Sequence, residues 1–311
     1  MRKIIIDTDI GDDIDDAFAL LTALACDNDD LLGVTTVYKN TLQRARIAKC
    51  LLQAAGRGEI PVFAGHDHPL KEEIVRWPYE QIGKDGKINV HHYRDFMENT
   101  VVEQGKAEDF ILETAAKYPG EVTLIAIGPF TNLAKAIQKD RAGFLRLKEA
   151  YVMAGHPTLP YPEWNIRVDP EAADTFFRSG LPIHCVGLNV TTLCKLYAEQ
   201  IAKVRAFRSP AVKLVADMMD IWIESNNPQG GISRFPTMHD PLCVLASQYE
   251  DVCKFERSEF SVCLSGKERS YLVQDGKGTP MEIAAEADTE GFYRRFFQAI
   301  GSYEIGEEET G

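Results

Sequence analysis

Short apolar segments alternate with segments of helical periodicity along most of the 311-residue chain. The apolar segments are hydrophobic throughout rather than at every second position, which is typical of parallel strands covered by helices on both faces. They predict strands at 3–6, 31–38, 60–65, 121–128, 149–155 and 182–189. The pattern therefore predicts an α/β fold with a mainly parallel central sheet flanked by helices.

Amphipathic segments between these strands predict the crossover helices. The expected ranges are 15–25, 41–55, 107–118, 131–139, 170–179, 210–225 and 239–248. Thr41 is the expected N-cap of the second helix, and the Asp169-Pro170 pair is a typical helix start. Residues 66–106 have weak periodicity, and we interpret them as a divergent insertion or lid within a single domain that spans 1–311.

Composition and charge narrow the possible functions. The chain is 45% hydrophobic and carries a formal net charge of -13, which argues against a sequence-independent nucleic-acid binder and favours small-molecule partners. No apolar run approaches the roughly 18 residues of a membrane span, and the N-terminus lacks a signal-peptide pattern. We therefore expect a cytoplasmic protein without a membrane partner. The seven cysteines include no CxxC pair and are interpreted as reduced thiols.

Acidic residues concentrate directly after the first strand. The first sixteen residues include six aspartates, at positions 7, 9, 12, 13, 15 and 16. This position is the carboxyl edge of a parallel sheet, where ligands bind. Carboxylates packed this closely repel one another, and a hard divalent cation such as calcium or magnesium would compensate. The alternative, helix caps and solvated turn residues, explains one or two of the six.

A strand that ends in DxD is also typical of phosphatases of the haloacid dehalogenase type. In that interpretation Asp7 is the nucleophile and Asp9 is the acid. Such phosphatases carry Gly-Thr next, whereas this chain has Ile10-Gly11-Asp12. This difference weighs against a magnesium-dependent phosphatase, which is the less favoured alternative function.

The segment DTDIGDDIDDAFAL resembles DxDPGxDDxxAL, the signature of the inosine-uridine nucleoside hydrolase family. Four more segments resemble the family in order along the chain: GVTTVYKN, AIGPFTNLAKAI, EWNIRVDPEAA and HDPLCVLA. The resemblance implies a single α/β domain that hydrolyses the N-glycosidic bond of ribonucleosides with a tightly bound calcium ion. It also implies a homodimer or homotetramer. This chain departs from the signature by two extra residues before Asp15, by Ile10 where proline is usual, and by Lys39 where glycine is usual.

The resemblance also implies roles for individual residues. Asp9 matches the general base and His239 the acid that protonates the leaving base. The matching metal ligands are Asp9, Asp16, Asp240 and the main-chain carbonyl of Ile127. The matching substrate contacts are Asp15, Asn40, Asn165 and Asp240 for the ribose hydroxyls, and Glu163 for the 5′-hydroxyl. Taken alone, Asn40, Asn165 and His239 could equally be turn or capping residues.

The implied chemistry agrees with the residue types. Calcium would orient and acidify a water molecule, and the carboxylates would stabilise the positive charge that develops on the sugar. The segment before Glu163 is shorter than usual and lacks an asparagine expected at the 5′-hydroxyl, so unmodified ribose is open to question. A non-catalytic sensor of calcium and ribose is a further alternative. Candidate aromatic residues for stacking on a base are Trp77, Tyr93, Trp222 and Phe235.

Overall fold

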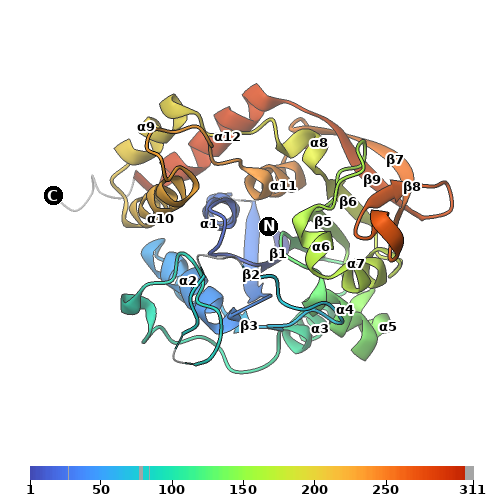
Figure 1. Ribbon diagram of the computed structural model, residues 1–311. Coiled ribbons are helices and arrows are strands. Elements are labelled where there is room, and N and C mark those ends of the chain that lie inside the picture. The colour runs from blue at the N-terminus through green and yellow to red at the C-terminus, as the bar shows by residue number, and fades with distance from the viewer. Residues whose placement is uncertain (27, 77–79, 84, 305–311) are drawn as a thin grey trace.

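A central sheet of nine strands organises the chain (Figure 1). The computed structural model describes residues 1–26, 28–76, 80–83 and 85–304. The strands, in their order across the sheet, are β3 (Val62–Ala64), β2 (Asp29–Thr36), β1 (Arg2–Thr8), β4 (Val122–Ala126), β5 (Glu149–Met153), β6 (Ile183–Val186), β9 (Thr279–Ala287), β7 (Cys253–Val262) and β8 (Leu272–Gln274). Neighbours from β3 to β9 run parallel, and β7 is antiparallel to both of its neighbours, β9 and β8. The predicted mainly parallel sheet is confirmed.

Helices cover both faces of this sheet. They are α1 (Asp15–Leu24), α2 (Thr41–Ala54), α3 (Ala107–Lys117), α4 (Thr131–Lys139), α5 (Arg141–Phe144), α6 (Trp164–Val168), α7 (Pro170–Phe177), α8 (Leu188–Thr191), α9 (Ala198–Ala206), α10 (Pro210–Asn226), α11 (His239–Gln248) and α12 (Thr289–Gly301), with 3-10 turns η1 (Asp95–Met97), η2 (Gly266–Glu268) and η3 (Ser302–Glu304). The seven predicted helices are present, with ends that differ by two residues or fewer. The N-cap of α2 is Asn40 rather than Thr41, because the Asn40 side chain accepts the backbone N–H of Gln43.

Strand β1 shows how apolar residues build the two halves of the core. Ile4 and Ile6 point to one face, where they belong to the cluster formed by α1, α2 and α9 to α12. Ile5 points to the other face and joins the cluster formed by α3, α4, α5 and α7. Because successive side chains alternate between faces, a strand buried on both sides must be apolar at every position.

The C-terminal strands β7, β8 and β9 extend the sheet beyond the part that the sequence predicts. Strand β7 mixes charged and apolar residues, KFERSEFSV after Cys253, and four of its ten residues are exposed. This polarity hides the strand from a search for apolar runs, because antiparallel strands near a sheet edge need bury only part of their side chains.

Residues 66–106 contain η1 as their main regular element among the described positions. Two carboxylates of this segment hold it against the turn between β2 and α2, since Glu80 contacts Lys39 and Asp85 accepts a hydrogen bond from Asn40. A lid function for the segment stays a prediction. The cysteines are free thiols, as expected. Within the described part of the chain, no helix has both the length and the apolar character that a membrane span requires.

Candidate active site

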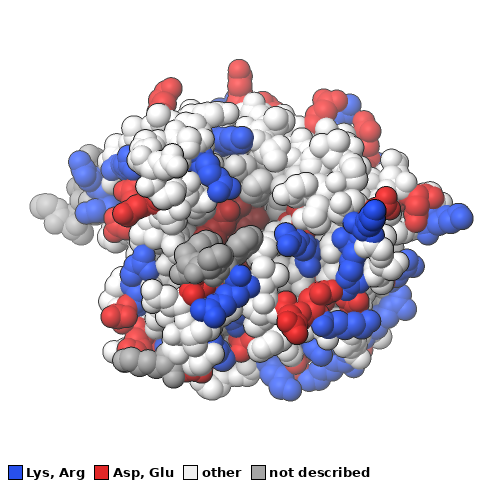
Figure 2. Space-filling model, in the orientation of Figure 1, with Lys and Arg blue, Asp and Glu red and all other residues white. Residues whose placement is uncertain are grey.

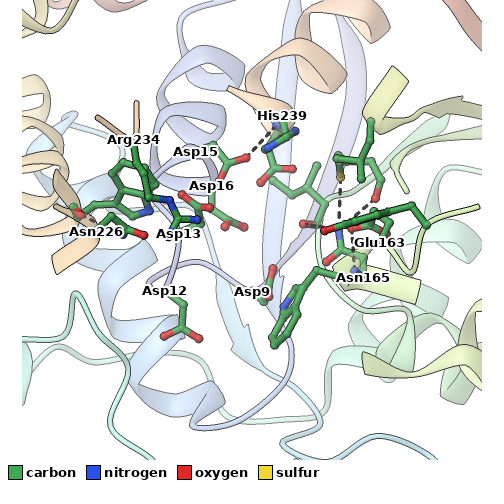
Figure 3. Close-up of a pocket in the computed structure, with 17 residues that line it drawn as sticks. Asp9, Asp12, Asp13, Asp15, Asp16, Glu163, Asn165, Asn226, Arg234 and His239 are labelled. Atoms are coloured by element: carbon green, nitrogen blue, oxygen red, sulfur yellow. Dashed lines mark hydrogen bonds between the residues drawn. The ribbon is translucent and has the colours of Figure 1, made fainter. Parts of the chain in front are cut away.

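A pocket of about 330 Å³ opens at the carboxyl edge of the parallel strands (Figure 3). Its walls come from the loop after β1, from the residues that follow β4 and β5, and from α1, α6, α10 and α11. Figure 2 shows acidic side chains within the hollow at the centre of this face. The aspartate-rich segment thus lies where parallel-sheet proteins bind ligands.

Three carboxylates converge in the pocket. Asp15 and Asp16 begin α1, Asp240 lies in the first turn of α11, and one oxygen of each lies within 4.8 Å of the others. All three are buried. Burial, followed by the charges of neighbouring aspartates, raises the pKa of each well above its ordinary value. Buried like charges with oxygen donors suit a hard divalent cation. Two of these three residues, Asp16 and Asp240, are among the predicted metal ligands, whereas Asp15 was predicted to contact ribose.

Asp9 lies directly after β1 and lines the same pocket with 8% of its surface exposed. It is not one of the three converging carboxylates. Burial raises the pKa of Asp9 to about 6, although the charge of Arg44 opposes this effect. The pocket therefore places a carboxylate that is ionised above mildly acidic pH beside the acidic cluster.

A buried arginine fixes the backbone that carries Asp9. Arg44 is fully buried, and its Nη1 donates to the carbonyl oxygens of Asp9 and Ile10. Its Nε donates to the carbonyl oxygen of Tyr38 at 2.8 Å, and its Nη2 donates to Asp12 at 2.7 Å. One side chain of α2 therefore ties the loop after β1 to the turn after β2.

Lys39 completes this charge network. Its buried Nζ contacts Glu80 and lies 3.3 Å from Asp12. Burial would raise the pKa of Asp12, but the charges of Arg44 and Lys39 outweigh it and hold that pKa below its ordinary value. Two of the three departures noted in the sequence, the longer aspartate loop and Lys39, are thus parts of one network of paired charges.

The turn that carries Lys39 has an unusual backbone. Tyr38 and Lys39 have φ angles of 71° and 59°, values that side-chain-bearing residues rarely adopt. Such strain is concentrated at functional sites. Gly11, in the facing loop, has a φ of 119°, and a Cβ there would lie 2.4 Å from Val90. Only glycine fits at this point of the aspartate loop.

Asn40 and Asn165 were both predicted to contact ribose. In the structure, only Asn165 is among the residues that line the pocket. Asn40 caps α2 and donates to Asp85 at 2.9 Å, and it is not among the residues that line the pocket. Asn165 does line the pocket, where its Nδ2 donates to the carbonyl oxygens of Met153 at 3.1 Å and Ile127 at 3.3 Å. Asn165 therefore lies next to the carbonyl that was predicted to bind metal.

Glu163 lies at the opposite side of the pocket from α10 and caps α6. Its carboxylate accepts backbone N–H groups from Gly155, Asn165 and Ile166 at 2.8 to 3.2 Å. Burial nevertheless raises the pKa of Glu163 to about 7.

His239, the first residue of α11, also lines the pocket, and its Nδ1 lies 2.7 Å from Thr191 Oγ1. Burial lowers the pKa of His239 to about 4.

Comparison with known families identifies the fold and the reaction. A sequence model described as inosine-uridine preferring nucleoside hydrolase matches residues 4–294. The chain belongs to this family. As a nucleoside hydrolase it is an enzyme that cleaves the N-glycosidic bond of ribonucleosides, which are small-molecule substrates, as the sequence analysis predicted.

Relatives of this nucleoside hydrolase span plants and bacteria. Uridine nucleosidase 1 of Arabidopsis thaliana is 34% identical over 309 residues, covering 93% of this chain and 90% of its own. The pyrimidine-specific ribonucleoside hydrolase RihB of Escherichia coli O9:H4 (strain HS) is 31% identical, covering 97% and 98%. Among solved structures, the purine-preferring ribonucleoside hydrolase from Gardnerella vaginalis is 27% identical with a TM-score of 0.83, covering 98% of this chain and 100% of that one.

The structure also bears on the aromatic candidates of this nucleoside hydrolase. Trp222, in α10, lines the pocket. Tyr93 accepts a hydrogen bond from Arg46, and Phe235 packs against Tyr197 with ring centroids 5.2 Å apart; neither lines the pocket. Trp77 lies outside the described residues.

The pocket is also lined by residues that were not predicted as site residues, among them Asp13, Asn226 and Arg234. Asp13 projects from the aspartate loop, Asn226 ends α10, and Arg234 follows it in the Gly-rich loop. Burial raises the pKa of Asp13 to about 6. The sequence offered one indication of Arg234 as a site residue, namely a basic residue in the loop that precedes the HDP segment. By itself this indication is weak.

The phosphatase alternative does not fit this geometry. Asp7 is fully buried and is not among the pocket-lining residues. Its Oδ1 accepts hydrogen bonds from Thr35 at 2.5 Å and Asn132 at 2.7 Å. A nucleophile must reach its substrate, and the packing around Asp7 excludes one.

Proposed function

We propose that this nucleoside hydrolase is calcium-dependent and that Asp9 is its general base. The supporting observation is the convergence of Asp15, Asp16 and Asp240 in one buried pocket with Asp9 beside them. A buried acidic cluster of this kind favours a compensating cation, and its all-oxygen donors favour calcium or magnesium over zinc. Between the two, the resemblance to the family signature supports calcium.

The residues that would hold the ion are Asp9, Asp16, Asp240 and the carbonyl of Ile127, with Asp15 as an additional neighbour. When bound, calcium orients a water molecule and increases its acidity. Asp9 would act as the general base and take a proton from the water molecule that attacks the anomeric carbon. Arg44 holds the Asp9 backbone in place, which keeps the carboxylate directed into the pocket.

The sugar would lie between the acidic cluster and α6. Asp15, Asn165 and Asp240 bind its hydroxyl groups, and Glu163 binds the 5′-hydroxyl. The surrounding carboxylates stabilise the positive charge that develops on the sugar as the bond to the base lengthens. His239 faces the same pocket and donates a proton to the leaving base, with Thr191 orienting the ring. Asn40 contributes by capping α2 beside this site.

Uridine is the first substrate to test, because several relatives of this chain are uridine nucleosidases. Purine nucleosides belong in the same assay, since a structurally similar enzyme prefers them. Homodimer or homotetramer formation and a cytoplasmic location remain predictions.

The experiment measures base release from uridine, cytidine, inosine and adenosine, with calcium and with EGTA. We expect hydrolysis of at least one nucleoside, its loss in EGTA, and its recovery with added calcium. Asp9→Ala should abolish turnover without unfolding the protein, whereas Asp174→Ala, which removes a surface carboxylate of α7, should not. Unchanged turnover in Asp9→Ala would refute the assigned base. Tight substrate binding without turnover in the wild type would instead identify a sensor.

A further inference from the structure

The pocket has a second end that the roles assigned above do not use. Figure 3 places Glu163 and Asn165 on one side of the acidic cluster, and Asn226 and Arg234 on the other. In a nucleoside, the base and the 5′-hydroxymethyl group extend from carbons on opposite sides of the ring oxygen. If the 5′ end lies at Glu163, as the proposed function requires, the base extends toward Arg234.

This end of the pocket combines a flat apolar surface with polar groups. Trp222 is 9% exposed and contributes the apolar surface, and Asn226 and Asp13 line the same pocket. Arg234 is the single lysine or arginine among the described residues that line the pocket. The remaining charged side chains that line it are carboxylates, apart from the imidazole of His239. In this binding mode the guanidinium of Arg234 lies at the end of the pocket that the leaving base would occupy.

A buried amide fixes the backbone of Arg234. Asn227 is 8% exposed, and its Oδ1 accepts the backbone N–H groups of Ser233 at 2.9 Å and Arg234 at 2.8 Å. Its Nδ2 donates to the carbonyl oxygens of Ile223 at 2.8 Å and Arg234 at 3.1 Å. One side chain thus closes the loop from α10 onto itself and holds both backbone groups of the arginine. Arg234 itself is exposed, so this amide fixes the backbone of the arginine and leaves its side chain accessible to a ligand.

We propose that Arg234 contacts the leaving base and stabilises its negative charge, and that Asn227 is its positioning residue. This inference rests on the proposed function. When the bond between the anomeric carbon and the base nitrogen breaks, its electron pair stays with the base and spreads onto the ring nitrogens and carbonyl oxygens. The guanidinium donates hydrogen bonds to such an acceptor until the base receives its proton. The substrates selected are ribosides whose heterocyclic base carries a carbonyl oxygen.

The test compares two leaving groups. Uridine loses a base that departs poorly, whereas p-nitrophenyl β-D-riboside loses a nitrophenolate that needs little help. Arg234→Gln should lower kcat for uridine about a hundredfold, as expected for one donor to a developing anion, and change kcat for the aryl riboside threefold or less. Arg234→Lys, which keeps the charge but not the planar fork, should be intermediate. Asn227→Ala should follow Arg234→Gln in direction for uridine.

The matched control is Arg146→Gln, which removes an exposed arginine just before β5, at the edge of the sheet away from the pocket. This variant should behave as the wild type with both substrates. Equal losses with both substrates in Arg234→Gln, or no loss with uridine, would overturn the inference and leave the hydrolase function standing. A wild type that cleaves the aryl riboside but no nucleoside would also overturn it. A wild type that cleaves neither would remove the proposed function and this inference together.

Discussion

Neutralising one member of the acidic cluster should stabilise the metal-free protein. Asp16→Asn keeps the shape of the side chain and an oxygen that can accept the Thr8 hydroxyl, so it changes mainly charge. Two unit charges 4.8 Å apart, the upper separation in the cluster, repel by about 3.5 kcal/mol at an effective dielectric constant of 20. Asp16 has two such neighbours, Asp15 and Asp240.

The repulsion energies from Asp15 and Asp240 do not simply add. The pKa of each carboxyl is raised, so protons partly neutralise the cluster. We therefore expect Asp16→Asn to raise the free energy of unfolding by roughly 3 kcal/mol at pH 8 without metal, close to one pairwise repulsion. Carboxyls with a raised folded-state pKa stabilise the fold while protonated. This contribution is present at low pH and is lost as the pH rises from about 4 through the folded-state pKa values.

The assay is urea unfolding at pH 5.5 and pH 8, in EGTA and in calcium. Wild-type stability in EGTA should fall toward pH 8, and calcium should restore it by more at pH 8 than at pH 5.5, because the ion replaces the protons. Asp16→Asn should flatten the pH dependence and lose the response to calcium. Asp174→Asn, which removes a partly exposed carboxylate of α7 outside the cluster, serves as the control and should keep the response to calcium. A variant no more stable than the wild type at pH 8 in EGTA would refute the reasoning.

Three further predictions test other parts of the site. Arg44→Met should lower the free energy of unfolding by about 3–5 kcal/mol in urea titrations, because it leaves Asp12 and several carbonyls without their donor; a loss below 1 kcal/mol would contradict this. Gly11→Ala should lower stability by about 1–3 kcal/mol, measured by thermal unfolding, since its Cβ would clash with Val90; wild-type stability would show that the loop adapts. His239→Gln should slow uridine hydrolysis about 10²- to 10⁴-fold and the aryl riboside far less, and equal effects on both would argue against a leaving-group acid.

Several features of this nucleoside hydrolase follow from local sequence. The apolar runs determine the parallel strands, because a strand buried on two faces has no polar positions, and periodicity locates the crossover helices. The chain also places Asp9 at the end of its first strand, so the sheet edge that binds ligands was predictable. Strands β7 to β9 were not, because an accessible antiparallel strand carries a mixed pattern that local periodicity does not separate from a loop.

The pairing of side chains across the molecule was decided by tertiary structure alone. The sequence contains Arg44, Lys39 and Asp12, but only the packing of α2 against the aspartate loop makes them one buried network. From the sequence, Asn40 could be a ligand contact or a helix cap. Only the structure shows that it caps α2, where its side chain accepts the backbone N–H of Gln43 and donates to Asp85. A local pattern records which elements form, whereas contacts between distant residues depend on how those elements pack, and periodicity carries no information about that packing.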